Sequence, residues 1–325
     1  MLAIFRNNNF LSVFLIPLIA AALWFNAFEQ PPILPVKHTM PLYETLWYIL
    51  GNSFTVKIWV AFFLIIFEAF YLNLIFDKHN FLNRKSFLPA IIYVLLVSSF
   101  KEAQQLNPII CAMLFLMFAF SKIVKTYRQD SASSEIFDAS ILISIATLFY
   151  FPVIIIYPII WVALIVIRPF IWREWIISLS GFILPYLFVF MAYYWFNRVS
   201  FFVFDKIVFP ASFHLQDIFS ESVYTKITLS IFALFALLGI INSIAKVSTN
   251  TIFARNMAVI MVWTLLLSIA TFFLSPQASI VYFLCSFIPI TYYFSNMFIN
   301  IKKMWLGEIL FISFILLAII NVYFG

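Results

Sequence analysis

The chain has 325 residues, of which 65% are hydrophobic and only 10% are charged, and its mean hydropathy is +1.07. A soluble domain could not cover that much apolar surface, because globular proteins are about half apolar and about a quarter charged. Lipid is therefore expected to be the solvent for most of the chain. The formal net charge of +6 fits basic residues that fix membrane topology, and we expect no nucleic-acid partner.

Eleven apolar stretches follow one another along the chain. In lipid each should be a helix, because its backbone groups must be satisfied within the segment, and a crossing takes about 20 residues. The sequence therefore predicts an all-α, polytopic transmembrane bundle of about 11 helices, forming one integral-membrane domain over residues 1–325. The helices are expected at about 10–28, 54–76, 86–101, 107–124, 137–150, 152–168, 174–196, 226–246, 257–274, 278–298 and 304–323.

Three of these helices, at about 86–101, 137–150 and 152–168, are short, so one of them is a candidate for a broken or re-entrant element. Phe151 and Pro152 mark a hinge between the last two. The basic residues predict the orientation. With a cytoplasmic N-terminus and alternating crossings, 13 of the 19 Lys and Arg residues lie inside, and every inside loop holds at least one.

Two outer segments are longer than turns. In the first, at about 29–53, the sequence PLYETLWYIL starts at Pro41 and predicts a short helix in the membrane interface. The second, at about 197–225, mixes aromatic and acidic residues and is expected to pack on the outer face of the bundle.

Several kinds of chemistry are excluded by residue counts. The three histidines, His38, His79 and His214, fall on different sides of the predicted bundle, so they cannot form one metal site. The five glycines include no phosphate-binding loop. Cys111 and Cys285 both lie in apolar stretches without CxxC spacing, and we expect them to be small buried residues.

Glu68 is the most deeply placed acidic residue, within VAFFLIIFEAFYLNLIF. Charge in a membrane span is costly and often functional, so Glu68 is a candidate substrate-binding or proton-coupled carboxylate that faces a cavity. The alternative is a neutral carboxyl hydrogen-bonded within the helix packing, near Asn73. Asp138, Glu174 and Glu308 are expected in the first turns of helices, where they complement the dipole.

Two further carboxylates lie just beyond helix ends on the predicted outer side. Glu29 occurs in WFNAFEQPP and Glu102 in SSFKEAQQLNP. Such a pair could hold a divalent cation or supply a catalytic base, which makes both residues catalytic candidates. Lys101 and Arg198 are candidates for binding the phosphate of a lipid substrate beside them. The alternative for each is a solvated loop charge.

The segments MLAIFRNNNF, PLYETLWYIL, EIFDASILISIATLFYFPVIII and RPFIWREWIISLSGFILPYLF together resemble a family of uncharacterised multi-pass inner-membrane proteins of Bacteroidota. The likeness covers essentially the whole chain. It implies a location in the bacterial inner membrane.

The order of elements also resembles polyprenyl-phosphate-sugar glycosyltransferases of the GT-C class, which begin with a helix, an acidic outer loop and interfacial helices. This likeness implies that Glu29 and Glu102 occupy the acidic positions and that a polyprenyl-phosphate lipid carries the sugar. The chain departs from that pattern because it has no DxD motif and no large C-terminal outer domain.

Three functions follow from these observations. A glycosyltransferase acting at the outer face is the leading specific hypothesis, and it would use Glu29 and Glu102. A transporter or flippase would use Glu68 and the helices that prolines are expected to interrupt, at Pro17, Pro152, Pro158, Pro185 and Pro289. A non-catalytic subunit or scaffold would instead require a membrane-protein partner and no particular carboxylate.

Overall fold

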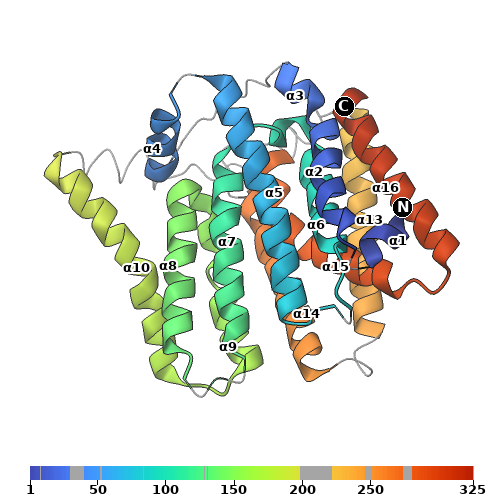
Figure 1. Cartoon of the computed structure of the whole chain (residues 1–325). Helices are drawn as coiled ribbons and strands as arrows, with labels where there is room; N and C mark the ends of the chain where they lie inside the picture. Colours follow the sequence, from blue (N-terminus) through green and yellow to red (C-terminus); the bar gives the residue numbers. More distant parts are fainter. Residues whose placement is uncertain are drawn as a thin grey trace.

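The structure is a computed structural model that describes residues 1–7, 9–29, 40–51, 53–82, 84–127, 129, 131–197, 222–245, 251–273 and 280–324. These residues form helices and contain no strand, which confirms the all-α prediction (Figure 1). Six helices are long and apolar enough to cross a membrane. They are α5 (Phe54–Lys78), α7 (Pro108–Lys125), α10 (Trp172–Trp195), α13 (Val223–Ala245), α14 (Ile252–Phe273) and α16 (Met304–Phe324).

Shorter helices complete the bundle, so that each of the eleven predicted stretches contains helix. The α-helices are α1 (Leu2–Arg6), α2 (Leu11–Leu23), α3 (Phe25–Glu29), α4 (Pro41–Ile49), α6 (Leu88–Ser98), α8 (Ser133–Phe149), α9 (Ile159–Ile167) and α15 (Phe287–Asn300). Three segments are 3-10 helix: η1 (Lys101–Ala103), η2 (Phe151–Ile156) and η4 (Ile280–Ser286). The protein is therefore a multi-pass, membrane-embedded helical bundle.

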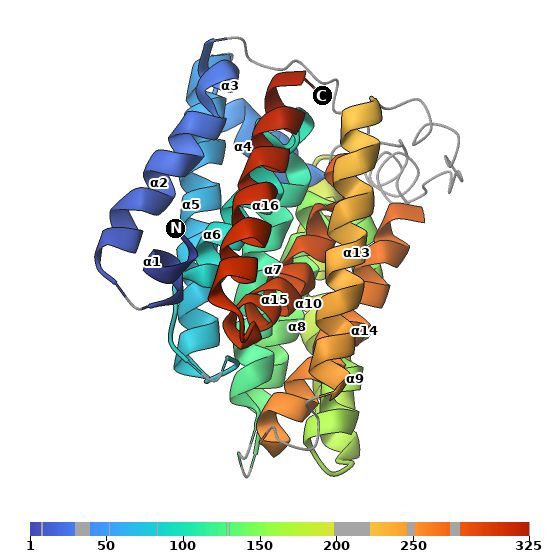
Figure 2. The ribbon, with the colours of Figure 1, turned by 90° about the vertical axis from the view of Figure 1, so that its right-hand side faces the viewer.

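Two short helices form the centre of the bundle. Every residue of α6 is buried, and α15 is buried from Phe287 to Ile299. α6 is apolar almost all round, as expected of a helix that other helices enclose, whereas α15 also buries the polar side chains of Thr291, Ser295 and Asn296. The two helices pack against each other, with α5 against α6 and α13 against α15. Figure 2 shows α2, α16 and α13 side by side over this centre.

Broken helices occur at two places in the bundle. α8 ends at Phe149, and η2 then leads through Pro158 into α9, so the predicted break at Phe151 and Pro152 is confirmed. The second break, where η4 precedes α15, occurs beside Pro289, one of the prolines expected to interrupt a helix. The same expectation is wrong for Pro17 and Pro185, which lie inside the continuous helices α2 and α10. Pro289 lies in the first turn of α15 and lacks the N–H that a continuous α-helix would donate to the carbonyl of Cys285. The chain therefore starts a new α-helix at this point.

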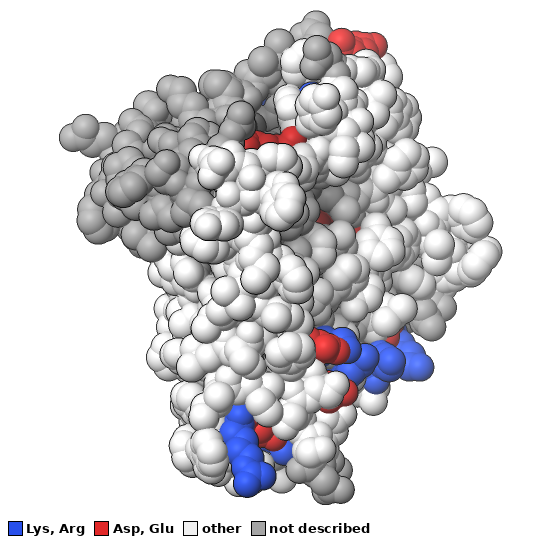
Figure 3. Space-filling model, turned by 90° about the vertical axis from the view of Figure 1, so that its left-hand side faces the viewer, with Lys and Arg blue, Asp and Glu red and all other residues white. Residues whose placement is uncertain are grey.

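The surface of the long helices is apolar. Only Glu174, Ser178 and Gly181 are buried in α10, and most of its remaining side chains are apolar and exposed. On the face shown in Figure 3, Lys and Arg gather towards the lower end, and the middle of the face is almost free of charge. This distribution suits a bundle whose middle contacts lipid.

The helix predicted to begin at Pro41 is present as α4, with Pro41 at its start. Its Tyr43 is buried and donates a hydrogen bond of 2.9 Å to the carbonyl of Leu106, while Tyr48 and Ile49 are exposed. Burial raises the pKa of Tyr43, so this hydroxyl stays protonated and continues to donate. The segment predicted to pack on the outer face, about 197–225, lies outside the described residues from 198 to 221.

Candidate functional site

A buried carboxyl lies near the middle of the bundle. Glu68, midway along α5, and Tyr93, on α6, are both 0% exposed. The hydroxyl of Tyr93 donates a hydrogen bond of 2.7 Å to Oε2 of Glu68. Oε1 of Glu68 is buried and has no hydrogen-bond partner among the described residues. The interpretation that placed Asn73 beside this carboxyl is wrong, because the Asn73 amide donates to Asp77 at 3.0 Å.

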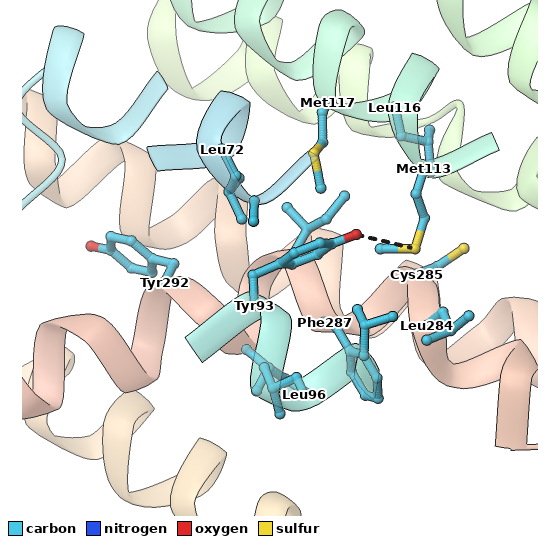
Figure 4. Packing of buried hydrophobic residues seen from close by; sticks show 14 of the residues in the cluster. Leu72, Tyr93, Leu96, Met113, Leu116, Met117, Leu284, Cys285, Phe287 and Tyr292 are labelled. Atoms are coloured by element: carbon cyan, nitrogen blue, oxygen red, sulfur yellow. Dashed lines mark hydrogen bonds between the residues drawn. The ribbon is translucent and has the colours of Figure 1, made fainter. Parts of the chain in front are cut away.

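The surroundings of the pair are apolar and rich in sulfur. Figure 4 shows the hydroxyl end of Tyr93 directed towards Met113, with Met117 and Cys285 beside it. The hydroxyl lies 3.9 Å from Sδ of Met113, and the thiols of Cys111 and Cys285 are close enough to interact electrostatically with Glu68. In the part of the chain that the structure describes, no Lys, Arg or His forms an ion pair with Glu68.

This geometry allows two arrangements of one proton. A carboxyl without a cation in an apolar site is stable as the neutral acid. The acid can donate from Oε2 to the Tyr93 oxygen, which frees the phenol proton to point at Met113. When the acid loses its proton, the phenol turns and donates to Oε2 instead. The pair can therefore take up and release a proton by rotating one hydroxyl.

A small apolar cavity of about 20 Å³ lies next to this group, and Cys285 forms part of its wall together with Leu116 and Thr264. The volume suits about one water molecule. Cys285, at the point where η4 meets α15, thus belongs both to the cavity wall and to the surroundings of Tyr93, whereas Glu68 itself does not line the cavity.

The outer-face candidates lie at the other end of α5 and α7 from most of the Lys and Arg residues. Glu29 is exposed at the end of α3, whereas Glu102 is half-buried in η1 with Lys101 next to it. Oε2 of Glu102 is inaccessible and has no hydrogen-bond partner within the described ranges. Gln104, directly after η1, donates a hydrogen bond of 3.1 Å to the carbonyl of Leu23, shortly before α3, so Glu29 and Glu102 lie at the same end of the bundle. Arg198 lies outside the described residues.

Within the described ranges, no group of three or more His, Cys, Asp and Glu side chains is placed to hold a metal ion. Both cysteines are buried and free, as predicted.

The carboxylates expected at helix starts have more specific partners. Asp138 is not in the first turn, because α8 begins at Ser133, and it pairs with Lys122 at 2.5 Å. Glu174 is in the first turn of α10 and forms a buried ion pair with Arg168. Glu308 is also outside the first turn, because α16 begins at Met304, and it accepts hydrogen bonds from the backbone N–H groups of Leu2 and Ala3.

Comparisons of the chain with protein-family models, with curated proteins and with solved structures find no match. Its function is therefore argued from its own residues. The most informative of these, Tyr93, was not singled out from the sequence. A lone Tyr inside PAIIYVLLVSSF was the available signal, since a buried phenol needs a hydrogen-bond partner.

Proposed function

We propose that this multi-pass membrane protein is a proton-coupled transporter or lipid flippase in which Glu68 carries the coupling proton. The observation that supports it is the Glu68 carboxyl, which is fully buried, has no cationic partner among the described residues and hydrogen-bonds to Tyr93 through one oxygen only. Placing an ionisable residue inside a membrane bundle costs free energy, and proton relays are one of the main functions that such residues serve.

The broken helices add support. Transporters commonly place their substrate and ion sites where helices are interrupted near the middle of the membrane. In this chain one interruption lies between η4 and α15, next to Cys285, which is close enough to Glu68 to interact with it electrostatically. A second interruption lies between η2 and α9. A carboxyl beside an interrupted helix can gain access to one side of the membrane when the short helix moves.

The proposed cycle follows from the two proton arrangements. The neutral acid is stable in the closed bundle, whereas the carboxylate needs water or a cation. Loss of the proton therefore favours a conformation that opens the bundle to solvent at Glu68, and proton binding favours closure. A solute or lipid that enters the opened bundle would move as the bundle closes.

The test uses proteoliposomes loaded with a pH-sensitive dye, with candidate solutes added outside and fluorescent phospholipids in the bilayer. A substrate that moves protons with the wild type should move none with Glu68→Gln, which mimics the permanently neutral acid. Glu135→Gln, the same change at the start of α8, is the matched control and should retain transport. Equal proton movement by wild type and Glu68→Gln would contradict the proposal.

A glycosyltransferase is the second candidate, and one observation favours it. Glu102 has a buried oxygen without a hydrogen-bond partner in the described chain, at the end that also carries Glu29. We propose that these carboxylates act as base or as ligands of a divalent cation towards a polyprenyl-phosphate sugar, with Lys101 and Arg198 binding the phosphate. An unchanged amount of lipid-linked sugar product in the variant with both Glu29→Gln and Glu102→Gln would contradict the glycosyltransferase proposal.

The finer topology is also a proposal. The Lys and Arg distribution supports about 11 crossings and a cytoplasmic N-terminus. Residence in the bacterial inner membrane is proposed from the resemblance to multi-pass inner-membrane proteins of Bacteroidota. A scaffold subunit is the remaining alternative. It would tolerate all three carboxylate replacements and would copurify with a membrane-protein partner.

A further inference from the structure

A large cleft lies at the end of the bundle where α5 and α7 finish and α14 begins. Its volume is about 800 Å³. The residues that matter for its chemistry are Lys78, His79, Lys125, Tyr127, Thr251 and Phe253. Lys78 is ten residues beyond Glu68 on α5, which is about 15 Å along the helix axis. The cleft is therefore separate from the buried carboxyl.

The cleft is positively charged. The described residues that line it include Lys78 and Lys125 but no Asp or Glu. Neither lysine forms an ion pair with any described residue, whereas Lys122, three residues before Lys125, pairs with Asp138. Among the described residues, no carboxylate therefore compensates these two ammonium groups at the cleft.

The pKa of His79 reflects this positive charge. Burial, and then the charges of Lys78 and Lys125, hold the pKa of His79 below its usual range. Its Nε2 atom is inaccessible and has no hydrogen-bond partner in the described part of the chain. Two lysine charges from different helices therefore converge on one wall of the cleft, beside a neutral imidazole.

The amino end of α14 forms another wall. The hydroxyl of Thr251 accepts a hydrogen bond of 3.3 Å from the backbone N–H of Ala254, and Ile252 and Phe253 line the cleft. The first N–H groups of a helix lack intrahelical acceptors and carry the positive pole of the dipole. The ring of Tyr127 packs on Phe253 with centroids 4.8 Å apart, which holds the end of α7 against the start of α14.

We propose that this cleft binds a phosphate-type anion, presented either by a soluble phosphorylated compound or by the headgroup of an anionic lipid. Two ammonium groups and a helix amino end are the groups that proteins use for phosphate. The dipoles of α5 and α7 account for lysines at their carboxyl ends, but not for the start of α14 at the same cleft. The volume leaves room for an organic group beyond the phosphate.

The experiment measures binding to the purified full chain and does not depend on transport. One arm titrates inorganic phosphate in detergent, against chloride at matched ionic strength, and follows the rise in Tm. The other compares retained lipid by native mass spectrometry after exchange into phosphatidylglycerol or phosphatidylcholine nanodiscs. The variants are Lys78→Gln with Lys125→Gln, the charge-preserving pair Lys78→Arg with Lys125→Arg, and Lys122→Gln.

Loss of both lysines should weaken binding about 100-fold, about tenfold for each charged contact. The arginine pair and Lys122→Gln should stay within about threefold of wild type, since they keep the cleft's charge. Binding in the phosphate arm identifies a soluble ligand, and binding only in the phosphatidylglycerol arm identifies a lipid headgroup. The proposal is overturned if neither probe binds, or if the double glutamine variant binds as well as wild type.

Discussion

The guanidinium of Arg168 and the carboxylate of Glu174 lie 3.0 Å apart, and their side chains are only 5% and 3% exposed. Arg168 also donates to the carbonyls of Thr126 and Gln129, and Oε1 of Glu174 accepts from the N–H of Ala132. One ion pair therefore ties the turn between α9 and α10 to the connection between α7 and α8. The carboxyl ends of α7 and α9 and the amino ends of α8 and α10 therefore meet at this ion pair, at the end of the bundle where the basic residues gather.

Breaking this pair should destabilise the protein strongly. Arg168→Gln leaves a buried carboxylate uncompensated, and the expected loss is about 3–5 kcal/mol of unfolding free energy. The measurement is reversible unfolding in mixed detergent micelles. Lys122→Gln breaks the more exposed Lys122–Asp138 pair and should cost about 1 kcal/mol or less. Similar losses for the two variants would contradict this assignment.

Tyr93→Phe should impair the proton site without removing its acid. The change leaves both oxygens of Glu68 without a protein hydrogen bond among the described residues, so the expected stability loss is about 1–3 kcal/mol. Proton-coupled transport should slow. Tyr71→Phe on the same α5 is the control and should change little, because it keeps the half-buried ring that packs against Phe118.

The two residues of the site should also be coupled. If Tyr93 acts through Glu68, the double variant Glu68→Gln with Tyr93→Phe should lose less stability than the sum of the single losses, by at least about 0.5 kcal/mol. The same unfolding assay supplies the four free energies of this double-mutant cycle, those of the wild type, the two single variants and the double variant. Strict additivity would mean that the hydrogen bond contributes nothing measurable.

Gly181→Ala should loosen the contact between α8 and α10. A Cβ at Gly181 would lie 2.8 Å from the backbone oxygen of Phe137 and 3.0 Å from Cβ of Ser140, so the two helices would have to move apart. Overpacking of this kind costs about 1–3 kcal/mol. A lowered Tm is the readout, and Ser180→Ala, whose side chain is exposed on the same helix, should leave Tm unchanged.

Cysteine labelling tests the topology. The native Cys111 and Cys285 are buried and should not react with a membrane-impermeant maleimide in the folded protein. Lys85→Cys and Lys303→Cys, at exposed positions, should be labelled only from the cytoplasmic side. Tyr48→Cys, on α4, should be labelled only from outside. Labelling of positions 85 and 303 from opposite sides would refute the predicted orientation.

Much of the fold was predictable because its causes are local. Hydropathy and the need to satisfy backbone groups in lipid place a helix in every apolar stretch, and Pro41 starts α4 because proline fits a first helical turn. Pro152 was enough to predict the first break. Pro289 gave the same signal for the second break. Pro17 and Pro185 gave it too, but α2 and α10 continue through them, because packing of neighbouring helices can satisfy the backbone groups that a proline frees.

The amino-acid sequence by itself determined that this chain is helical, that lipid is its solvent and that Glu68 lies deep in an apolar helix. Only the tertiary structure decided that Tyr93, rather than Asn73, meets that carboxyl, and that Lys78, Lys125 and the start of α14 share one cleft. The physical reason is the separation along the chain of the residues that interact. Solvent preference and helix formation are set by neighbours along the chain, whereas a hydrogen-bond partner depends on which helices pack together.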